Sequence, residues 1–429
     1  MAEINCLVFV DMTEKLILSG DVGGTNTRFQ LYRIHSSDPL LWKDVPMGCN
    51  APGLLVHKET FSNAEFSTFQ DILEKFLKDA RTLDKPEAAC LACAGPIFNN
   101  TVTLTNRDWV INGDSLAQAM GIRRILLVND FVGMGYGLLT LDVSTECVTL
   151  NEGTKQEGGP MGCVGAGTGL GECYLTAQKK RVPAPVYNDS TTSLNSASTV
   201  GQDSDVVQYE YQCYPTEGGH TDFAPRNDFE ADLLEYLRNK FAHEGSAYRI
   251  SNERVVAGSG IPNVYEYIAQ QNPKKVKKAV HEAILGAGDL KAGMIAKYSK
   301  GEDTCELCKK TMDIFLAHYG SEAGNCCLKW NPTGGLFITG GLTPKNLDRI
   351  KDPQDLFLPA LFEKGRVSPI VKACPVYAVL AENLGERGAH LVAFKALQDI
   401  HREDDELPVA LSDRGRGPSL RVPLIWTGV

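Results

Sequence analysis

A glycine-rich stretch near the start of the chain constrains the fold more than any other segment. Residues Leu16–Ile34 read LILSGDVGGTNTRFQLYRI, with an apolar run before the glycines and alternating apolar residues after them. This order predicts a β-hairpin. Gly23 and Gly24 lack Cβ atoms, so backbone N–H groups in the turn can approach an anion closely. Asp21 offers hard oxygen ligands that suit Mg²⁺ directly or through water, so the turn has the parts of a metal–phosphate site.

Two well-known phosphate-binding loops do not fit this turn. A P-loop needs G-x-x-x-x-G-K-[ST] before a helix, and the turn contains no such lysine. A dinucleotide fingerprint also opens a helix, whereas this turn opens a strand. An ordinary glycine-rich hairpin capped by Asp21 stays open as an alternative, because short motifs also match by chance.

A second stretch repeats the pattern farther along the chain. Residues Gly162–Leu175 place the sequence GAGTGLG between two apolar runs. Two such hairpins indicate an internally duplicated architecture. Between them, the apolar runs Ala88–Ala94 and Ile125–Val128 predict buried strands that alternate with helical patterns, which is typical of an α/β fold.

Composition excludes several classes of protein. The net charge is −10 over 429 residues, which argues against a nucleic-acid partner. No apolar run reaches the length of about 18 residues that a membrane helix needs, so we expect no membrane partner. The 13 cysteines are an odd number in a chain without an evident signal peptide, which predicts reduced thiols and a cytoplasmic location.

Eight motifs follow one another in order: LSGDVGGTNTR (18–28), LACAGPI (91–97), LTNRDWVI (104–111), LLVNDF (126–131), GAGTGLG (165–171), EGGHTDFAP (217–225), NERVVAGSG (252–260) and ITGG (338–341). With this set the chain resembles the bacterial-type (group A) glucokinases, which are sugar kinases of the actin-like ATPase superfamily. The resemblance runs from about Leu16 to Leu397. Relatives with a repressor or kinase role carry a cysteine-rich zinc signature after Gly-Gly-His, whereas Thr221–Pro225 follows here, which favours the zinc-free branch.

The resemblance implies an α/β fold of the duplicated actin-like (ribonuclease H-like) ATPase type, with two domains and a cleft between them. The stretch Lys179–Tyr214 is rich in Ser, Thr and Asn, which predicts an insertion loop. The expected segments are a leader (1–14), a small α/β domain (15–135), a large α/β domain (136–385) with the insertion loop (about 179–214), a closing helix that completes the small domain (about 386–401), and a C-terminal tail (402–429).

Asp130 is the candidate catalytic base. It follows a buried strand and Asn129, so we expect it at the carboxyl end of a strand, where α/β sheets bind ligands. The resemblance implies the same role, in which Asp130 accepts the proton of the hexose 6-hydroxyl during phosphoryl transfer. The alternative is that Asp130 only caps the helix starting at Phe131.

Selective binding of a hexose needs several fixed polar partners for its ring of hydroxyl groups. In Glu217-Gly-Gly-His220, a flexible turn lets both polar side chains point into one cleft. The simpler alternatives are a structural role for His220 and a contact of Glu253 with the dipole of a helix start. Residue chemistry and resemblance together give the expected sugar-binding set: Asn129, Asp130, Glu217, His220, Glu253 and Asn106, with Asp108 helping to orient the sugar loop.

For the nucleotide, the resemblance implies ATP with Mg²⁺, the metal held by Asp21 directly or through water. Arg28 is a possible phosphate contact, although an exposed strand arginine is the simpler account. A homodimer is also implied. The expected nucleotide-binding residues are Asp21, Gly23, Gly24, Thr25, Asn26, Thr168, Gly169, Gly340 and Gly341.

The cysteines include pairs with zinc-like spacing. Cys90 and Cys93 lie in an apolar strand whose alternation points them to opposite faces, and Cys305 and Cys308 have no histidine at ligand spacing. We therefore expect packed or free thiols and no zinc.

The sequence thus predicts an ATP-dependent kinase that phosphorylates D-glucose at the 6-hydroxyl, the first step of glycolysis. A kinase of another hexose or of an N-acetylhexosamine is the alternative enzyme. A non-catalytic sugar sensor is the alternative from another class, and no helix-turn-helix module is evident to support it.

Overall fold

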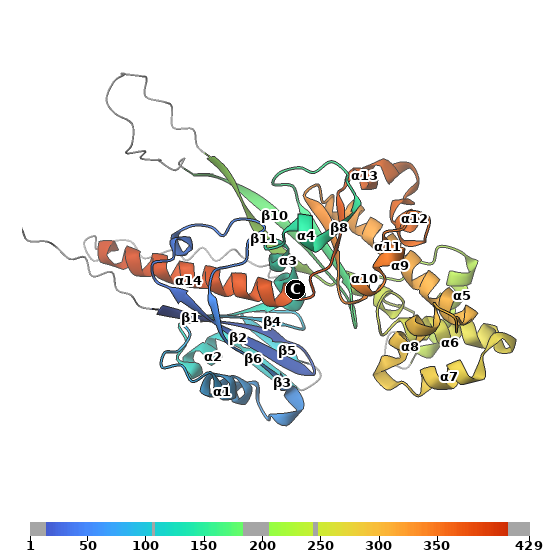
Figure 1. The fold of residues 1–429 in the computed structure, drawn as a ribbon, viewed down its shortest axis with the longest axis horizontal. Coiled ribbons are helices and arrows are strands. Elements are labelled where there is room, and N and C mark those ends of the chain that lie inside the picture. Colours follow the sequence, from blue (N-terminus) through green and yellow to red (C-terminus); the bar gives the residue numbers. More distant parts are fainter. Residues whose placement is uncertain (1–13, 105–107, 183–205, 243–247, 411–429) are drawn as a thin grey trace, which may run out of the picture.

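The computed structural model describes residues 14–104, 108–182, 206–242 and 248–410. These residues form two central sheets with helices on their faces, and a short ribbon of β5 (Thr101–Leu104) and β6 (Trp109–Asn112). Almost all of the expected leader lies outside the described residues, and only Glu14 is seen, as the first residue of a strand. Figure 1 shows the two sheets side by side, with the expected α/β architecture around each.

The first sheet has the strand order β3-β2-β1-β4-β7. The expected hairpin is confirmed, because β1 and β2 pair antiparallel and residues 23–25 form the turn between them. Strands β4 and β7 then continue the sheet parallel to β1. The strands are β1 (Glu14–Val22), β2 (Asn26–His35), β3 (Leu54–Ser62), β4 (Ala88–Cys93) and β7 (Arg124–Asn129).

The second sheet repeats this pattern in the order β11-β10-β9-β12-β13-β8. Strands β9, β10 and β11 form an antiparallel meander, and β12 and β13 continue parallel to β9. The matching order of strands supports the internal duplication that the two hairpins predict. The strands are β8 (Cys147–Asn151), β9 (Met161–Ala166), β10 (Leu170–Val182), β11 (Val206–Thr216), β12 (Gly335–Thr339) and β13 (Val376–Val379).

Helices cover both faces of the first sheet. Helices α1 (Phe69–Ala80) and α2 (Gly113–Met120) pack on one face, and α14 (Leu384–Ala410) packs on the other beside α3 (Asp130–Leu138). Cys93 belongs to the first of these cores and Cys90 to the second, so the predicted alternation of the two thiols is confirmed. Figure 1 shows α14 lying along the sheet.

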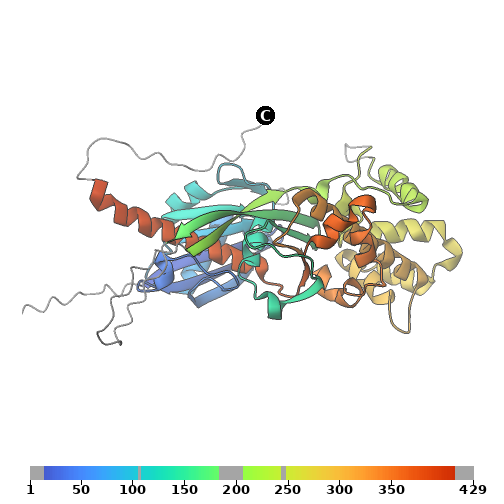
Figure 2. The same ribbon diagram turned by 90° about the horizontal axis from the view of Figure 1, so that it is seen from above.

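The second sheet is backed by a helical layer around α9 (Glu306–Trp330), whose inner face is buried in the largest core cluster. The helices of this layer lie at the far end of the molecule from α14 (Figure 2). They are α5 (Asp228–Lys240), α6 (Ile261–Gln271), α7 (Lys278–Leu285), α8 (Lys291–Tyr298), α12 (Phe357–Phe362) and α13 (Ser368–Ala373), with the short helices α10 (Leu342–Lys345) and α11 (Leu347–Ile350) nearby. The short helix α4 (Val143–Glu146) instead lies near the start of α14, where Glu146 pairs with Arg387.

The predicted insertion loop is wrong at both ends. Strand β10 continues through Val182 and β11 begins at Val206, so the expected loop residues on either side of 183–205 are paired strands. Exposed polar side chains, such as Lys180 paired with Glu210, gave these strand ends the composition of a loop. Figure 2 shows the two strands as a long ribbon reaching over α14. Residues 183–205 lie outside the described part of the chain.

The predicted boundary of the tail is also wrong. Helix α14 does not end near residue 401 but continues to Ala410. Its polar end is tied to the first sheet by ion pairs from Arg123 to Asp404 (2.7 Å) and from Arg124 to Glu403 (2.8 Å). Among the described helices, none combines the length and apolar composition needed to cross a membrane.

Candidate functional site

The turn between β1 and β2 is held from behind by Asn63. The Asn63 side chain is fully buried, donates to the Gly23 carbonyl (2.8 Å) and accepts from the Thr27 hydroxyl (2.8 Å). Its backbone N–H donates to the Thr25 carbonyl (2.8 Å), and Gly23 N–H donates to the Asn26 carbonyl (3.0 Å). These bonds fix the backbone of the turn, and none of them uses the N–H group of Gly24 or Thr25.

Asp21 lies at the end of β1, opposite Arg28 in the register. Its Oδ2 accepts a hydrogen bond from the Arg28 guanidinium at 2.9 Å. Burial nevertheless raises the pKa of Asp21 above its ordinary value, because desolvation outweighs the charge of Arg28. A partly desolvated carboxylate of this kind gains from a nearby cation, so Asp21 fits a magnesium-binding role directly or through water.

The second turn, between β9 and β10, is closed by a hydrogen bond from Gly167 N–H to the Gly169 carbonyl (2.8 Å). A later segment supports it, with Gly258 N–H donating to the Gly167 carbonyl (2.8 Å) and Ser259 N–H donating to the Thr168 carbonyl (3.2 Å). This turn occupies in the second sheet the place that residues 23–25 occupy in the first.

Gly340 and Gly341 follow β12 and lie against the second turn. Gly340 has a φ of 81°, and a Cβ there would stand 2.4 Å from the Ala166 carbonyl oxygen, so no other residue fits without strain. Gly341 has open space beside it. The buried Tyr319 of α9 fastens this region, because its hydroxyl accepts from Ala166 N–H (3.2 Å) and donates to the Thr339 carbonyl (3.0 Å).

A cavity of about 1280 Å³ opens beside the two turns. Thr25 of the first turn, Thr168 of the second turn and Gly341 all contribute to its lining, so these predicted nucleotide-binding residues are brought together. Asp21, Gly23, Gly24, Asn26, Gly169 and Gly340 belong to the same turns or adjoin them. Farther along, the lining combines apolar and basic side chains from α6, α8, α9 and α10: Ile261, Pro262, Leu342, Lys291, Lys309 and Lys345.

Asp130 is the first residue of α3, at the carboxyl end of β7. Asn129 is the N-cap: its Oδ1 accepts from Phe131 N–H (3.0 Å) and its amide donates to the Gly95 carbonyl (3.1 Å). The alternative in which Asp130 caps the helix is therefore wrong, although its Oδ1 also accepts from Phe131 N–H (2.9 Å).

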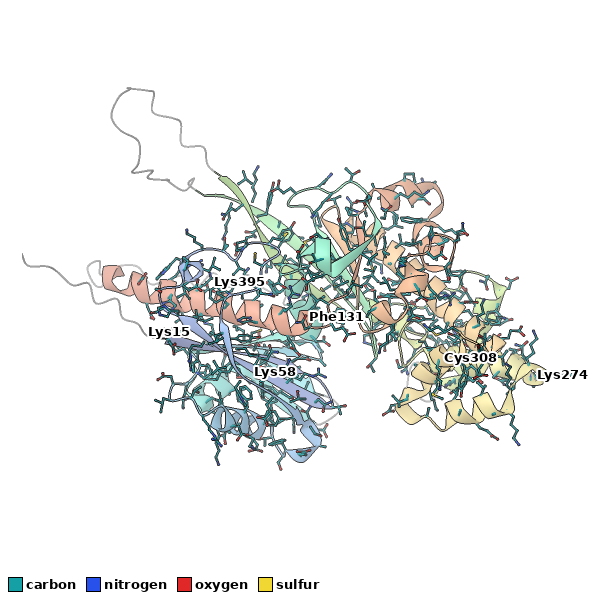
Figure 3. The ribbon with its side chains drawn as sticks, in the orientation of Figure 1. Lys15, Lys58, Phe131, Lys274, Cys308 and Lys395 are labelled. Carbon is teal, nitrogen blue, oxygen red and sulfur yellow. The ribbon has the colours of Figure 1, made fainter. Side chains whose placement is uncertain are left out.

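Phe131 fixes α3 against the second sheet. A Cβ on Gly171 would stand 1.8 Å from the Phe131 ring, so β10 accepts this ring only because residue 171 is glycine. Figure 3 labels Phe131 at the inner end of α14, between the two halves of the molecule. Asp130 is thus anchored to both sheets.

The carboxyl group of Asp130 has an unusual environment. Burial raises its pKa from 3.8 to about 6, and the negative charges of Asp21 and Glu217 add to this effect, while the hydrogen bond from Phe131 opposes it. Asp130 is therefore close enough to the first glycine-rich turn and to the Glu217 segment to be affected by the charge of a carboxylate in each. A carboxylate with a pKa near 6 is ionised at neutral pH and is a stronger base than an ordinary aspartate.

Glu217, His220 and Glu253 come together as predicted. Nδ1 of His220 is 3.3 Å from Glu253 Oε1, and Nε2 of His220 is 3.7 Å from Glu217 Oε2. Glu217 precedes the short 3₁₀ turn Gly218–His220 and His220 is its last residue, while Glu253 lies in the 3₁₀ turn Asn252–Arg254. A Cβ on Gly169 would be 3.2 Å from Glu253 Oε2, which places this trio beside the second turn.

Two further residues, Asn106 and Asp108, belong to the predicted sugar site. Asn106 lies outside the described residues. Asp108 is exposed and has a φ of 54°, in the left-handed region, where aspartate is tolerated. Every cysteine in the described ranges is free, and Cys305 and Cys308 are buried in one core cluster.

Sequence patterns did not point to several residues that build the site. Asn63 and Tyr319 act on turns far away in the chain, so no local motif includes them. Phe131 ends the motif LLVNDF, but the motif gives no sign of its contact with Gly171. Glu172 of β10 left one signal, a single acidic residue within the apolar strand pattern GECYL.

Comparison with known proteins agrees with these features. The glucokinase family model matches residues 18–209 and 199–396. A glucokinase from Nostoc punctiforme is 36% identical over 386 residues, which cover 88% of this chain and 98% of the relative. A glucokinase from Escherichia coli is 28% identical over 383 residues, which cover 88% of this chain and 97% of the relative.

Solved structures give the same result for the fold. The crystal structure of a glucokinase from an Antarctic psychrotroph matches with a TM-score of 0.63 and 28% identity, over 89% of this chain and 99% of that one. A glucokinase from Balamuthia mandrillaris matches with a TM-score of 0.64 over 90% and 95% of the two chains, and at 19% identity it supports the fold alone. The family model, the curated relatives and the fold agree that this chain belongs to the glucokinase family.

Proposed function

We propose that the protein transfers the γ-phosphoryl group of ATP to the 6-hydroxyl of D-glucose, giving glucose 6-phosphate. One observation carries the proposal: Asp130, at the carboxyl end of β7, lies within electrostatic range of both Asp21 of the first glycine-rich turn and Glu217 of the polar trio. A base between a phosphate-binding turn and a polyol-binding group is the arrangement that phosphoryl transfer to a sugar requires.

Asp130 accepts the proton of the attacking hydroxyl in this mechanism. Because its pKa is about 6, it is ionised at neutral pH and still basic enough to take a proton as the hydroxyl attacks. The Asn129 cap and the Phe131–Gly171 contact hold it in place. Such positioning contributes to catalysis because the reacting groups meet in a fixed geometry.

Glu217, His220 and Glu253 bind the sugar hydroxyls, together with Asn129 and Asn106. Carboxylates accept hydrogen bonds from hydroxyl groups, and an imidazole can accept or donate. The spacing of the trio supports this role, since the two carboxylates approach His220 from different segments and leave it half exposed. A sugar that left one of these groups unpaired would bind less well.

MgATP is the second substrate. The backbone N–H groups of residues 24–26 and of Thr168 and Gly169 bind its phosphates, and Asp21 would hold the magnesium ion directly or through water. Gly340 and Gly341 adjoin the adenosine, for which the apolar lining of the cavity by Ile261 and Leu342 is suitable. A magnesium ion bound at Asp21 would supply positive charge that offsets the charge of the phosphates.

Two further proposals concern the location of the protein in the cell and its oligomeric state. Free cysteines throughout the described residues are typical of a reducing compartment, which supports a cytoplasmic location. The homodimer implied by the resemblance remains a prediction, and light scattering of the purified chain tests it.

An assay of ADP release across glucose, mannose, fructose and N-acetylglucosamine tests the proposed function. We expect the highest kcat/KM with glucose. A highest value with N-acetylglucosamine would replace glucose kinase with N-acetylhexosamine kinase. Sugar binding without ADP release from any of the four would favour the non-catalytic sensor.

A further inference from the structure

Two buried carboxyl groups lie behind the sugar-binding residues. Glu172 of β10 is 1% exposed and Glu322 of α9 is 5% exposed. Their carboxylate oxygens and the sulfur of Cys326 lie within 4.8 Å of one another. We call Glu172, Glu322, Cys326 and Lys329 the buried carboxyl cluster.

The two carboxyl groups differ sharply in their partners. Glu322 Oε2 accepts from the side-chain amides of Asn252 and Asn325, both at 3.0 Å. Glu322 Oε1 accepts from the Lys329 ammonium at 3.0 Å. Neither oxygen of Glu172 has a hydrogen-bond donor among the described residues, although both are buried. An unpaired ionised carboxylate at such depth is very costly.

The cluster supports both segments that carry the sugar-binding trio. A Cβ on Gly218 would stand 1.7 Å from Glu172 Oε2, so the carboxyl group packs directly under the turn from Glu217 to His220. Glu322 holds Asn252, the residue before Glu253, through the 3.0 Å hydrogen bond. A displacement within the cluster would therefore move Glu217, His220 and Glu253.

The charges of the cluster do not balance when both carboxyl groups are ionised. Within the cluster, Lys329 is paired with Glu322, so an ionised Glu172 would have no cation of its own. Burial, and next the charge of Glu322, raise the pKa of Glu172 to about 7, and Lys329 opposes this only in part. Burial keeps the pKa of the Cys326 thiol well above its ordinary value, so the thiol is neutral. Lys364 also faces Glu322, and its own amino group is directed to the Ser321 carbonyl (2.9 Å).

We propose that Glu172 is a positioning residue for sugar binding, which keeps a proton shared with Glu322 and thereby holds the Gly218 turn and Asn252 in the glucose-binding geometry. The proposal rests on the proposed sugar-binding role of Glu217, His220 and Glu253. A proton satisfies the charge count, since the O–H of Glu172 donates to Glu322. A divalent cation in the same place would face the Lys329 ammonium at close range.

The raised pKa of Glu172 sets the direction in which pH changes stability. The folded chain binds the proton of Glu172 more tightly than the unfolded chain, whose carboxyl group has the ordinary pKa near 4.5. The contribution to stability therefore falls as pH rises from about 4.5 to about 7 and is lost above that range. Above pH 7, repulsion between Glu172 and Glu322 should loosen the turn and raise the KM for glucose.

The test compares wild type with Glu172→Gln and Glu172→Leu between pH 6 and pH 8. A glutamine amide donates permanently to Glu322, so E172Q should keep a low KM for glucose and lose most of the pH dependence of that KM. E172L cannot donate, and we expect its KM for glucose to rise about tenfold with little change in the KM for ATP, because a buried acceptor loses its partner. Glu230→Gln is the matched control, since Glu230 is also buried but pairs with His318 of α9 at 3.1 Å.

Thermal unfolding of the same variants gives a readout that needs no substrate. The Tm of wild type should fall from pH 6 to pH 8 by more than that of E172Q, and Asp130 contributes equally to both proteins. An equal pH dependence in the two proteins would overturn the shared proton, and an unchanged glucose KM in E172L would overturn the positioning role. Stoichiometric bound metal whose removal by EDTA weakens glucose binding would replace the proton with a metal ion.

The two proposals fail in different ways. If wild type prefers another hexose, the proposed substrate fails, while the unfolding comparison of wild type with E172Q still decides the shared proton. If wild type phosphorylates glucose and E172L retains the wild-type KM, the positioning role fails and the proposed function stands.

Discussion

Replacing the proposed base by its amide should remove catalysis and stabilise the protein at the same time. In Asp130→Asn, the side-chain oxygen can still accept from Phe131 N–H, as Asp130 Oδ1 does at 2.9 Å. The amide cannot accept a proton from the sugar. A positioned base contributes about 10²–10⁴ in rate, so we expect kcat to fall by that factor. The KM for ATP should change little, because Asp130 does not belong to either glycine-rich turn.

The structure also gives the magnitude of the stability change. The environment raises the pKa of Asp130 from 3.8 to about 6, chiefly by burial. At 1.36 kcal/mol for each pKa unit, the ionised carboxylate costs roughly 3 kcal/mol in the folded chain at neutral pH. The folded chain binds the proton of Asp130 more tightly than the unfolded chain, so the free energy of unfolding falls as pH rises from about 4 to about 6. The neutral amide avoids the cost, and D130N should gain up to about 3 kcal/mol above pH 6.

The assay couples glucose 6-phosphate formation to its dehydrogenase, and urea unfolding at pH 5 and pH 8 gives the stabilities. Wild-type kcat should fall as pH drops below about 6, because Asp130 then becomes protonated. Asp142→Asn is a suitable control, since Asp142 caps α4 through Ser144 and Thr145; it should keep kcat and lose some stability. A near-normal kcat in D130N would refute the role of Asp130 as base. A loss of kcat with no gain in stability would refute the electrostatic explanation.

Three other substitutions test separate parts of the site. Asn63→Ala removes the brace of the first turn, so the KM for ATP should rise about tenfold and stability should fall by roughly 1–3 kcal/mol, with an unchanged ATP KM contradicting the brace. Glu253→Gln changes one member of the sugar-binding trio, so isothermal titration should show weaker glucose binding with ATP binding retained; an equal loss for both ligands would point to misfolding instead. Cys93→Ala should lower stability, because it removes a buried thiol, and it should leave kcat intact. If the variant instead lost both a bound metal ion and its activity, the thiol would be a metal ligand.

Local sequence was sufficient where the structure is local. The two hairpins were predictable because each has its strands and its glycines within one short segment. The carboxyl end of β7 placed Asp130 correctly, and the Glu217-Gly-Gly-His220 turn did bring two polar side chains together with Glu253. These are contacts that a motif and its spacing can describe.

Features that depend on distant segments were not predictable in this way. Asn63 reaches the first turn from another strand end, and Tyr319 reaches the second turn from α9. The polar ends of β10 and β11 looked like a loop because their stability comes from pairing with each other along an exposed ribbon. The polar end of α14 has the composition of a tail. The arginine that pairs with it, Arg123, lies far away in the sequence, so no local pattern includes both partners.

Phosphorus NMR of the products identifies the atom that receives the phosphoryl group. The purified protein is incubated with MgATP and D-glucose, and the phosphorus signal is correlated with the protons of the sugar. We expect one sugar phosphate, whose phosphorus is coupled to the two protons at C6 and which forms in the same amount as ADP. Phosphate on another carbon, or ADP formed together with inorganic phosphate and no sugar phosphate, would contradict it.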